Sequence, residues 1–171
     1  NGVHSYTWTC EPFRDLYDRY IPGWANEPEL FVRVDHIPDG EVWEAHQKAK
    51  RTLLDLVRER SGIDMSPDIL TIGFARRAAT YKRADLIFED LKRIRRLGKG
   101  KLQIVYAGKA HPNDTEGKEM IRNVVKAMAA LQPDLPAAYL EGYDMALAGI
   151  LIPGVDLWLN NPVRPHEASG T

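Results

Sequence analysis

The sequence between residues 69 and 159 alternates between short apolar runs and longer stretches with helical periodicity. Short runs bounded by glycine and polar residues indicate buried strands, whereas apolar residues spaced three and four apart indicate amphipathic helices. The predicted strands cover residues 69–74, 102–107, 137–140 and 155–159, and the helices between them cover residues 84–97, 115–131 and 145–151. Strands connected through helices pair in parallel by right-handed crossovers. The pattern therefore predicts an α/β fold with a doubly wound parallel sheet, covered by helices on both faces.

The first 38 residues differ from this pattern because they are rich in aromatic residues and proline. They contain one predicted helix, residues 11–20, and we expect residues 1–38 to form a segment that enters the main domain. A second predicted helix starts after Asp39 as its N-cap and stops at Gly62. We expect residues 39–171 to form a partial Rossmann-like domain. Because the chain begins without methionine and stops without a helix end or a polar tail, we expect a truncated fragment of a longer protein.

Composition limits the possible partners. The net charge of -1 argues against a general nucleic-acid or membrane partner, so any electropositive site must be local. No apolar stretch approaches the roughly 20 residues that cross a bilayer. The single cysteine, Cys10, excludes an internal disulfide and fits a reducing compartment. We therefore expect a cytoplasmic protein.

A cluster of cations follows the first predicted strand. Arg76, Arg77 and Lys82 come where this strand ends and the next predicted helix begins. Cations at a helix start oppose the helix macrodipole unless an anion compensates them, and backbone N–H groups at a helix start also bind anions. We therefore predict an anion site, most simply for phosphate. The alternative is a basic helix start that is merely solvated.

Polar residues also follow the other predicted strands. In doubly wound sheets, ligands bind outside the carboxyl ends of the strands. The residues at these ends are Lys109 and His111 after the second strand, Tyr143 after the third, and Asn160, Arg164, His166 and Glu167 after the fourth. Each of them alone could be an ordinary surface residue. Together they predict a cleft for a phosphorylated, hydroxyl-rich molecule.

Three blocks of the sequence carry a family resemblance. They are Asn1-Gly2-Val3 through Trp8, Arg76-Arg77-Ala78-Ala79-Thr80-Tyr81-Lys82-Arg83, and Glu167-Ala168-Ser169-Gly170-Thr171. In these blocks the chain resembles the catalytic C-terminal half of the α-glucan (glycogen, starch and maltodextrin) phosphorylases, and is most similar to their bacterial branch. The chain departs from the classical pattern at Ala79, where classical members have histidine, and in the Asn-Pro-Val-Arg-Pro-His stretch before Glu167. The resemblance implies one Rossmann-like half of a GT-B architecture that uses pyridoxal phosphate.

The resemblance also implies roles for individual residues. The catalytic cations that hold the substrate phosphate and the cofactor's 5′-phosphate would be Arg76, Arg77 and Lys82. The glucose contacts would come from Asn1, Tyr81, Glu167, Ser169 and Gly170, and the cofactor contacts from Arg76, Tyr143 and Thr171. The lysine that forms the cofactor's Schiff base is expected a few residues beyond Thr171. We expect no metal ion.

The reaction implied by the resemblance is retaining phosphorolysis, in which an α-1,4-glucan and phosphate give glucose 1-phosphate. The fragment itself is expected to be inactive, because the cofactor lysine and the N-terminal domain of the parent protein are missing. Two alternatives stay open. One is a GT-B glucan synthase-type transferase that uses a nucleotide sugar, and the other is a non-catalytic module that binds a sugar phosphate or a protein.

Overall fold

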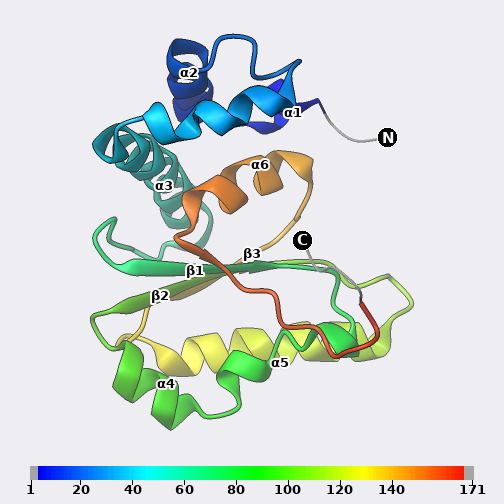
Figure 1. The fold of residues 1–171 in the computed structure, drawn as a ribbon. Coiled ribbons are helices and arrows are strands. Elements are labelled where there is room, and N and C mark those ends of the chain that lie inside the picture. Colours follow the sequence, from blue (N-terminus) through cyan, green and yellow to red (C-terminus); the bar gives the residue numbers. More distant parts are fainter. Residues whose placement is uncertain (1–3, 168–171) are drawn as a thin grey trace.

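The computed structural model describes residues 4–167, and a parallel four-stranded sheet lies at the centre of this part of the chain (Figure 1). The strands are β1 (Leu70–Ala75), β2 (Leu102–Ala107), β3 (Ala137–Leu140) and β4 (Leu157–Trp158). Their order in the sheet is β3-β2-β1-β4. β1 pairs with β2 along its whole length, but β4 pairs with β1 only at Ile72 and Gly73. The predicted α/β fold with a doubly wound parallel sheet is confirmed.

Helices cover both faces of the sheet, as predicted. In Figure 1, α3 (Asp39–Ser61) and α6 (Met145–Gly154) lie above the sheet, while α4 (Leu91–Gly98) and α5 (Thr115–Leu131) lie below it. Each face has its own apolar core, one containing Leu53, Val105 and Leu151 and the other Phe74, Ile104 and Leu131. α6 approaches α3 closely at Gly154, where a Cβ atom would lie 2.6 Å from the Cβ of Leu53.

The N-terminal residues form a helical unit that packs on the N-terminal part of α3. This unit contains α1 (Ser5–Trp8), α2 (Glu11–Tyr20) and a 3-10 helix, η1 (Pro28–His36). Its buried residues belong to a third apolar cluster: Leu16, Ile21, Trp24, Ile37 and Ala45. Because Ala45 belongs to α3, the unit packs directly on that helix. Most aromatic residues of the segment therefore share a core inside this chain, whereas Tyr6 and Trp8 are exposed.

Several elements have the predicted bounds, among them α2, α5, β2 and β3. The single helix predicted at residues 84–97 was wrong. The structure has a 3-10 turn, η3 (Leu86–Phe88), and α4 starts only at Leu91. Arg83 has a left-handed backbone with φ of 48°, which ends any helix there, and the Asp90 carboxylate caps α4 by accepting a hydrogen bond from the Arg93 N–H at 2.8 Å.

The boundaries of four other predicted elements also changed. Asp39 is the first residue of α3 and the N-cap is Pro38, whereas Gly62 ends the helix in a left-handed conformation as predicted. α6 continues to Gly154, three residues beyond the predicted end, and the fourth strand is shorter than expected, because only Leu157 and Trp158 pair with β1. β1 lies one residue later than the predicted strand.

A buried charge network holds the start of β4. The Lys50 ammonium is 2% exposed and donates hydrogen bonds to Asp156 Oδ2 at 2.7 Å and to the Ile69 carbonyl at 2.8 Å. Asp156 also accepts a hydrogen bond from the Thr71 N–H and contacts His46 Nε2, both at 2.7 Å. Burial alone would raise the pKa of Asp156, but these hydrogen bonds outweigh it and lower the pKa. The network thereby fastens β4 to α3 and β1 at the amino edge of the sheet.

Candidate functional site

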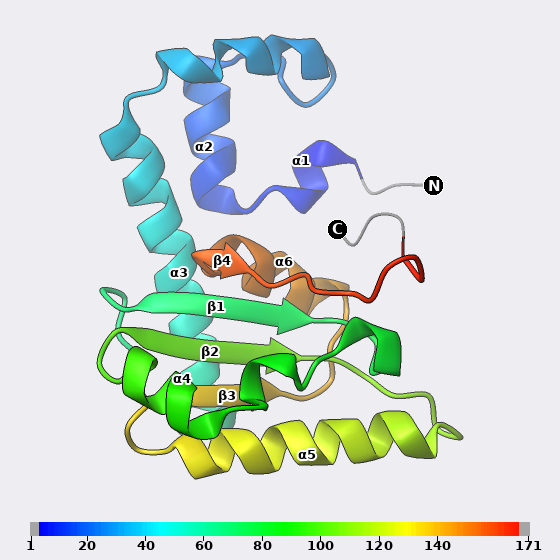
Figure 2. The same ribbon diagram turned by 60° about the horizontal axis from the view of Figure 1, so that its bottom comes forward.

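Loops that follow the four strands meet at the carboxyl edge of the sheet. In Figure 2 the arrowheads of β1 and β2 point toward the side where the loop after β1 and the C-terminal segment lie. The loops after β1 and β2 are joined by a hydrogen bond from the Ala78 N–H to the Lys109 carbonyl at 3.0 Å. Gly108 allows this close approach, because a Cβ atom there would collide with the Arg76 carbonyl oxygen.

The loop after β1 does not lead into a helix N-terminus, so the predicted convergence of cations and helix N–H groups was wrong. The loop contains only a 3-10 turn, η2 (Thr80–Lys82), and the next α-helix starts at Leu91. A three-residue turn carries no macrodipole comparable to that of a helix. Any anion at this loop must be held by side chains and local backbone groups.

Two of the predicted cations instead converge on Glu167. The Lys82 ammonium donates hydrogen bonds to Glu167 Oε2 at 3.0 Å and to Oε1 at 3.2 Å. The Arg76 guanidinium forms an ion pair with Glu167 Oε1 and donates a hydrogen bond to the Asn160 side chain. The hydrogen bond from Lys82 is the main cause that lowers the pKa of Glu167, and the charges of Arg76 and Lys82 add to it. Glu167 is therefore held as a carboxylate.

Lys82 is an unusual member of this cluster because its side chain is buried. The residue is 6% exposed, and its ammonium lies 4.8 Å from the centre of the Tyr81 ring. A buried ammonium requires a compensating charge or a strong set of acceptors. Here the carboxylate of Glu167 supplies the charge and the Tyr81 ring adds a cation–π contact.

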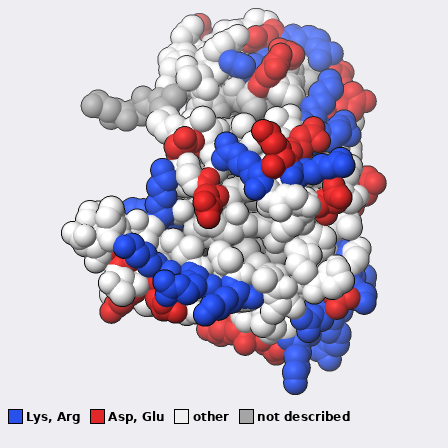
Figure 3. Space-filling view, turned by 180° about the vertical axis from the view of Figure 1, so that it is seen from behind, with Lys and Arg blue, Asp and Glu red and all other residues white. Residues whose placement is uncertain are grey.

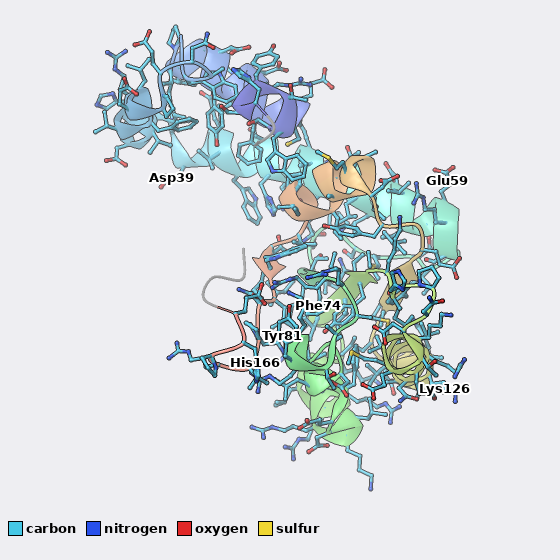
Figure 4. The ribbon with its side chains drawn as sticks, turned by 90° about the vertical axis from the view of Figure 1, so that its right-hand side faces the viewer. Asp39, Glu59, Phe74, Tyr81, Lys126 and His166 are labelled. Atoms are coloured by element: carbon cyan, nitrogen blue, oxygen red, sulfur yellow. The ribbon has the colours of Figure 1, made fainter. Side chains whose placement is uncertain are left out.

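The segment after β4 is tied to the loop after β1 at several points. The Val163 N–H donates to the Tyr81 carbonyl at 2.8 Å. Arg83 Nε donates to the Asn161 carbonyl at 2.8 Å, and the Asn161 amide donates back to the Arg83 carbonyl at 3.0 Å. Figure 4 shows Tyr81 and His166 beside each other, and their ring centres are 6.1 Å apart. Sequence reasoning missed Asn161, since its backbone-directed role leaves no pattern of residue types.

Arg77 and Lys109 lie at the same edge but are exposed. Among the ion pairs of residues 4–167, none involves either side chain. Arg77 follows Arg76 directly in the loop after β1, and its side chain is open to solvent. Its guanidinium is thus available to an anion from solution.

Tyr143 lies beside this cluster and lines a pocket. Burial raises the pKa of Tyr143, and the nearby positive charge of Arg76 lowers it in part. The pocket has a volume of about 440 Å³ and is lined by Trp8, Tyr143, Asp144, Met145 and Ala148. Its walls come from α1, from the loop after β3 and from α6, which places it next to the carboxyl edge.

The structure thus brings Arg76, Tyr81, Lys82 and Glu167 together and places Tyr143 near Arg76. Asn1, Ser169, Gly170 and Thr171 lie outside the described residues.

Within residues 4–167, no group of three or more His, Cys, Asp or Glu side chains is arranged to hold a metal ion. No described helix is long and apolar enough to cross a membrane. Acidic and basic residues are interspersed on most of the face in Figure 3, although a row of basic residues crosses its lower left part.

Comparison with known proteins gives the family. The sequence model for carbohydrate phosphorylases matches residues 25–171. Maltodextrin phosphorylase of Thermococcus litoralis is 43% identical over the whole chain, and glycogen phosphorylase of Aquifex aeolicus is 38% identical over the whole chain. The chain covers 23% and 28% of these two proteins, which is about a quarter of their length. The resemblance predicted from the sequence is confirmed, and the chain belongs to the carbohydrate phosphorylase family.

Proposed function

We propose that this chain is the part of a retaining α-glucan phosphorylase that holds phosphate and the terminal glucose at the carboxyl edge of its sheet. The parent protein would convert an α-1,4-glucan and phosphate into glucose 1-phosphate and a shortened glucan. The observation that carries the proposal is the convergence of Arg76 and Lys82 on Glu167, with Arg77 exposed in the same loop. One cluster then contains cations that can bind phosphate and a carboxylate that can accept hydrogen bonds from sugar hydroxyl groups.

Phosphate is the proposed ligand of the three cations. Arg76 and Arg77 can each present two N–H groups to phosphate oxygens, and Lys82 adds a compact charge. During the reaction a phosphate oxygen forms a bond to the anomeric carbon while the bond to the glucan oxygen breaks, and that oxygen receives a proton. Positive side chains around the phosphate stabilise the negative charge gathered there in the transition state.

The terminal glucose is the proposed ligand of the other site residues. An ionised Glu167 can only accept hydrogen bonds, which suits sugar hydroxyl groups as donors. The Tyr81 ring belongs to the same cluster, and the Lys82 ammonium lies over its face. Asn1, Ser169 and Gly170 complete the proposed sugar contacts.

Pyridoxal phosphate is the proposed cofactor. The pocket next to Tyr143 fits such a group, because Trp8 and Tyr143 offer aromatic surface for a planar ring and the positive charge of Arg76 lies nearby for its phosphate. Thr171 and a lysine beyond it would contribute further contacts. The phosphate of the cofactor would supply the proton relay for the reaction. Arg76 and Tyr143 would orient that phosphate, and Trp8 would exclude water from the ring.

The proposal includes the rest of the parent protein. An N-terminal domain would supply the other wall of the cleft, and the glucan would bind between the two domains. We also propose a cytoplasmic location, because phosphate and a charged sugar phosphate are retained inside a cell.

An assay of the parent protein tests this function. The protein, with added pyridoxal phosphate, would be incubated with maltodextrin and phosphate, and glucose 1-phosphate would be measured. We expect phosphate-dependent release, and no glucan extension from ADP-glucose or UDP-glucose. Extension from a nucleotide sugar without phosphorolysis would support the synthase-type alternative, and sugar-phosphate binding without turnover would support a binding module.

A further inference from the structure

We propose that Glu167 is an internal competitor for the anion site, whose carboxylate takes the place of a phosphate between Arg76 and Lys82 when no anion is bound. This inference rests on the proposed function and deepens it. It gives Glu167 a second role, as the residue that sets the anion affinity of the site.

The contacts of Glu167 are those expected of a bound oxyanion. Both of its carboxylate oxygens are occupied, Oε1 by Arg76 and Lys82 and Oε2 by Lys82. Two oxygens held by a guanidinium and an ammonium are also the pattern in which phosphate binds. The cluster is therefore already saturated by an anion that belongs to the chain.

The cations cannot easily serve a second anion while Glu167 stays. The Lys82 side chain is buried, so its ammonium has little freedom to turn toward another partner. Arg76 is held on one side by the Asn160 side chain and on the other by Glu167. A phosphate within contact distance of both cations would also lie against the Glu167 carboxylate, and like charges at such distances repel strongly.

Displacement of Glu167 requires only a local change. The hydrogen bonds at Asn161 and Val163 fix the earlier part of the segment to the loop after β1. The change therefore need not extend to residues before 164. Once displaced, the carboxylate is free to accept hydrogen bonds from sugar hydroxyl groups.

A coupling between the two substrates follows. Phosphate that binds Arg76 and Lys82 displaces Glu167, which can then accept hydrogen bonds from the sugar. A sugar that binds Glu167 leaves the two cations without their internal partner, so they can bind phosphate. Thermodynamic linkage makes this coupling reciprocal, so each ligand increases the affinity for the other.

Sulfate binding to the 171-residue chain provides the test. Sulfate keeps its charge across the working pH range, and its affinity can be measured by isothermal titration calorimetry. We expect Glu167→Gln and Glu167→Ala to bind sulfate on the order of tenfold more tightly than the unchanged chain, because the competing charge is gone. The matched control is Glu59→Gln, which removes the same charge near the end of α3, far from the cluster (Figure 4).

The outcomes separate this inference from the proposed function. Equal or weaker sulfate binding by both Glu167 variants, or an equal gain in Glu59→Gln, would overturn the competition. In the parent protein, Glu167→Gln should lower the KM for phosphate while raising that for glucan. If the parent shows no phosphorolysis but the Glu167 variants still bind sulfate more tightly, the competition stands and the reaction is wrong. If the parent protein shows phosphorolysis but the Glu167 variants do not bind sulfate more tightly, the proposed function stands and the competition is wrong.

Discussion

At the residue scale, the site is organised by charges that compensate one another within the chain. Lys82 is buried, and the single carboxylate of Glu167 compensates part of the positive charge of Lys82 and Arg76. Sequence reasoning correctly placed these residues at one edge of a sheet, because each of them follows a strand. It did not foresee that the compensating anion is Glu167, since contacts between residues 76 and 167 depend on the path of the whole segment after β4.

Replacement of Arg77 tests the phosphate assignment. In the parent protein, Arg77→Ala should lower the phosphorolysis rate about a hundredfold, because one charge-assisted contact in the transition state contributes roughly 3 kcal/mol. Arg77→Lys should restore only part of the rate, since lysine lacks the guanidinium fork. Arg96→Ala, on the exposed face of α4, serves as the control and should leave the rate unchanged. An Arg77→Ala protein with a normal rate and only a raised glucan requirement would show that phosphate binds elsewhere.

A buried tyrosine gives a second prediction. The Tyr106 side chain is 1% exposed, and its hydroxyl has no hydrogen-bond partner among the described residues. Tyr106→Phe should leave the free energy of unfolding unchanged or raise it by up to about 1 kcal/mol, because it removes an unsatisfied polar group. Tyr139 is the matched control, since its hydroxyl donates to the Gly108 carbonyl at 3.1 Å. Tyr139→Phe should lower the free energy of unfolding by about 1 kcal/mol in urea denaturation. Comparable losses in both variants would contradict the assignment.

At the scale of elements, the sequence predicted the central strands and the longest helices well, because burial imposes a clear period on them. β2, β3, α2 and α5 have the expected bounds. The break before α4 was not predictable from periodicity, because Leu86 and Ile87 continue the helical pattern. It depends on the left-handed backbone of Arg83, whose carbonyl accepts a hydrogen bond from the Asn161 amide, while the Arg83 side chain donates to the Asn161 carbonyl. Tertiary contacts thus overrode local propensity at the loop that forms the site.

The network around Asp156 gives a prediction for α3 and β4. Asp156→Asn should lower the free energy of unfolding by about 3 kcal/mol at pH 7, because Lys50 is then buried without a counter-charge. Adding Lys50→Met should recover part of this loss. The free energies of unfolding of both variants can be measured by urea denaturation. An Asp156→Asn variant as stable as the unchanged chain would show that the network contributes little to stability.

The pH dependence of stability follows from the same carboxylate. The folded-state pKa of Asp156 lies below its ordinary value of 3.8. The stability that Asp156 contributes is therefore complete above that value and is lost as the pH falls through the folded-state pKa. Thermal melts between pH 5 and pH 2.5 should show a smaller acid-induced loss in Asp156→Asn than in the unchanged chain. Parallel losses in the two proteins would rule out this contribution.

At the scale of the whole molecule, the described residues form three apolar cores but only part of the proposed functional site. The three clusters cover both faces of the sheet and the N-terminal unit. The family was predictable from its sequence blocks, but Asn1, Ser169, Gly170 and Thr171 lie outside the described residues. The roles of these four residues stay predictions.

The division between folding and function can be tested directly. The purified 171-residue chain, with pyridoxal phosphate added, should release no glucose 1-phosphate from maltodextrin, because the proposed cofactor lysine and opposing domain belong to the parent. The same preparation should bind sulfate, and this binding would show that the anion site is formed in the isolated chain. Phosphorolysis by this chain would mean that the reaction needs neither of the missing parts.

The short pairing of β4 has a consequence for local opening of the chain. β4 contacts β1 at only two positions, yet the segment that contains it is fastened by a lysine–carboxylate pair before the strand and by another after it. Backbone amides of this segment should therefore exchange with deuterium through a local opening, at a rate set by pH and bound anions. Amides of β2, in the interior of the sheet, should exchange only when the whole domain unfolds. β4 would thus be protected mainly by charge, and a ligand bound at the proposed site would change the exchange rate of its amides.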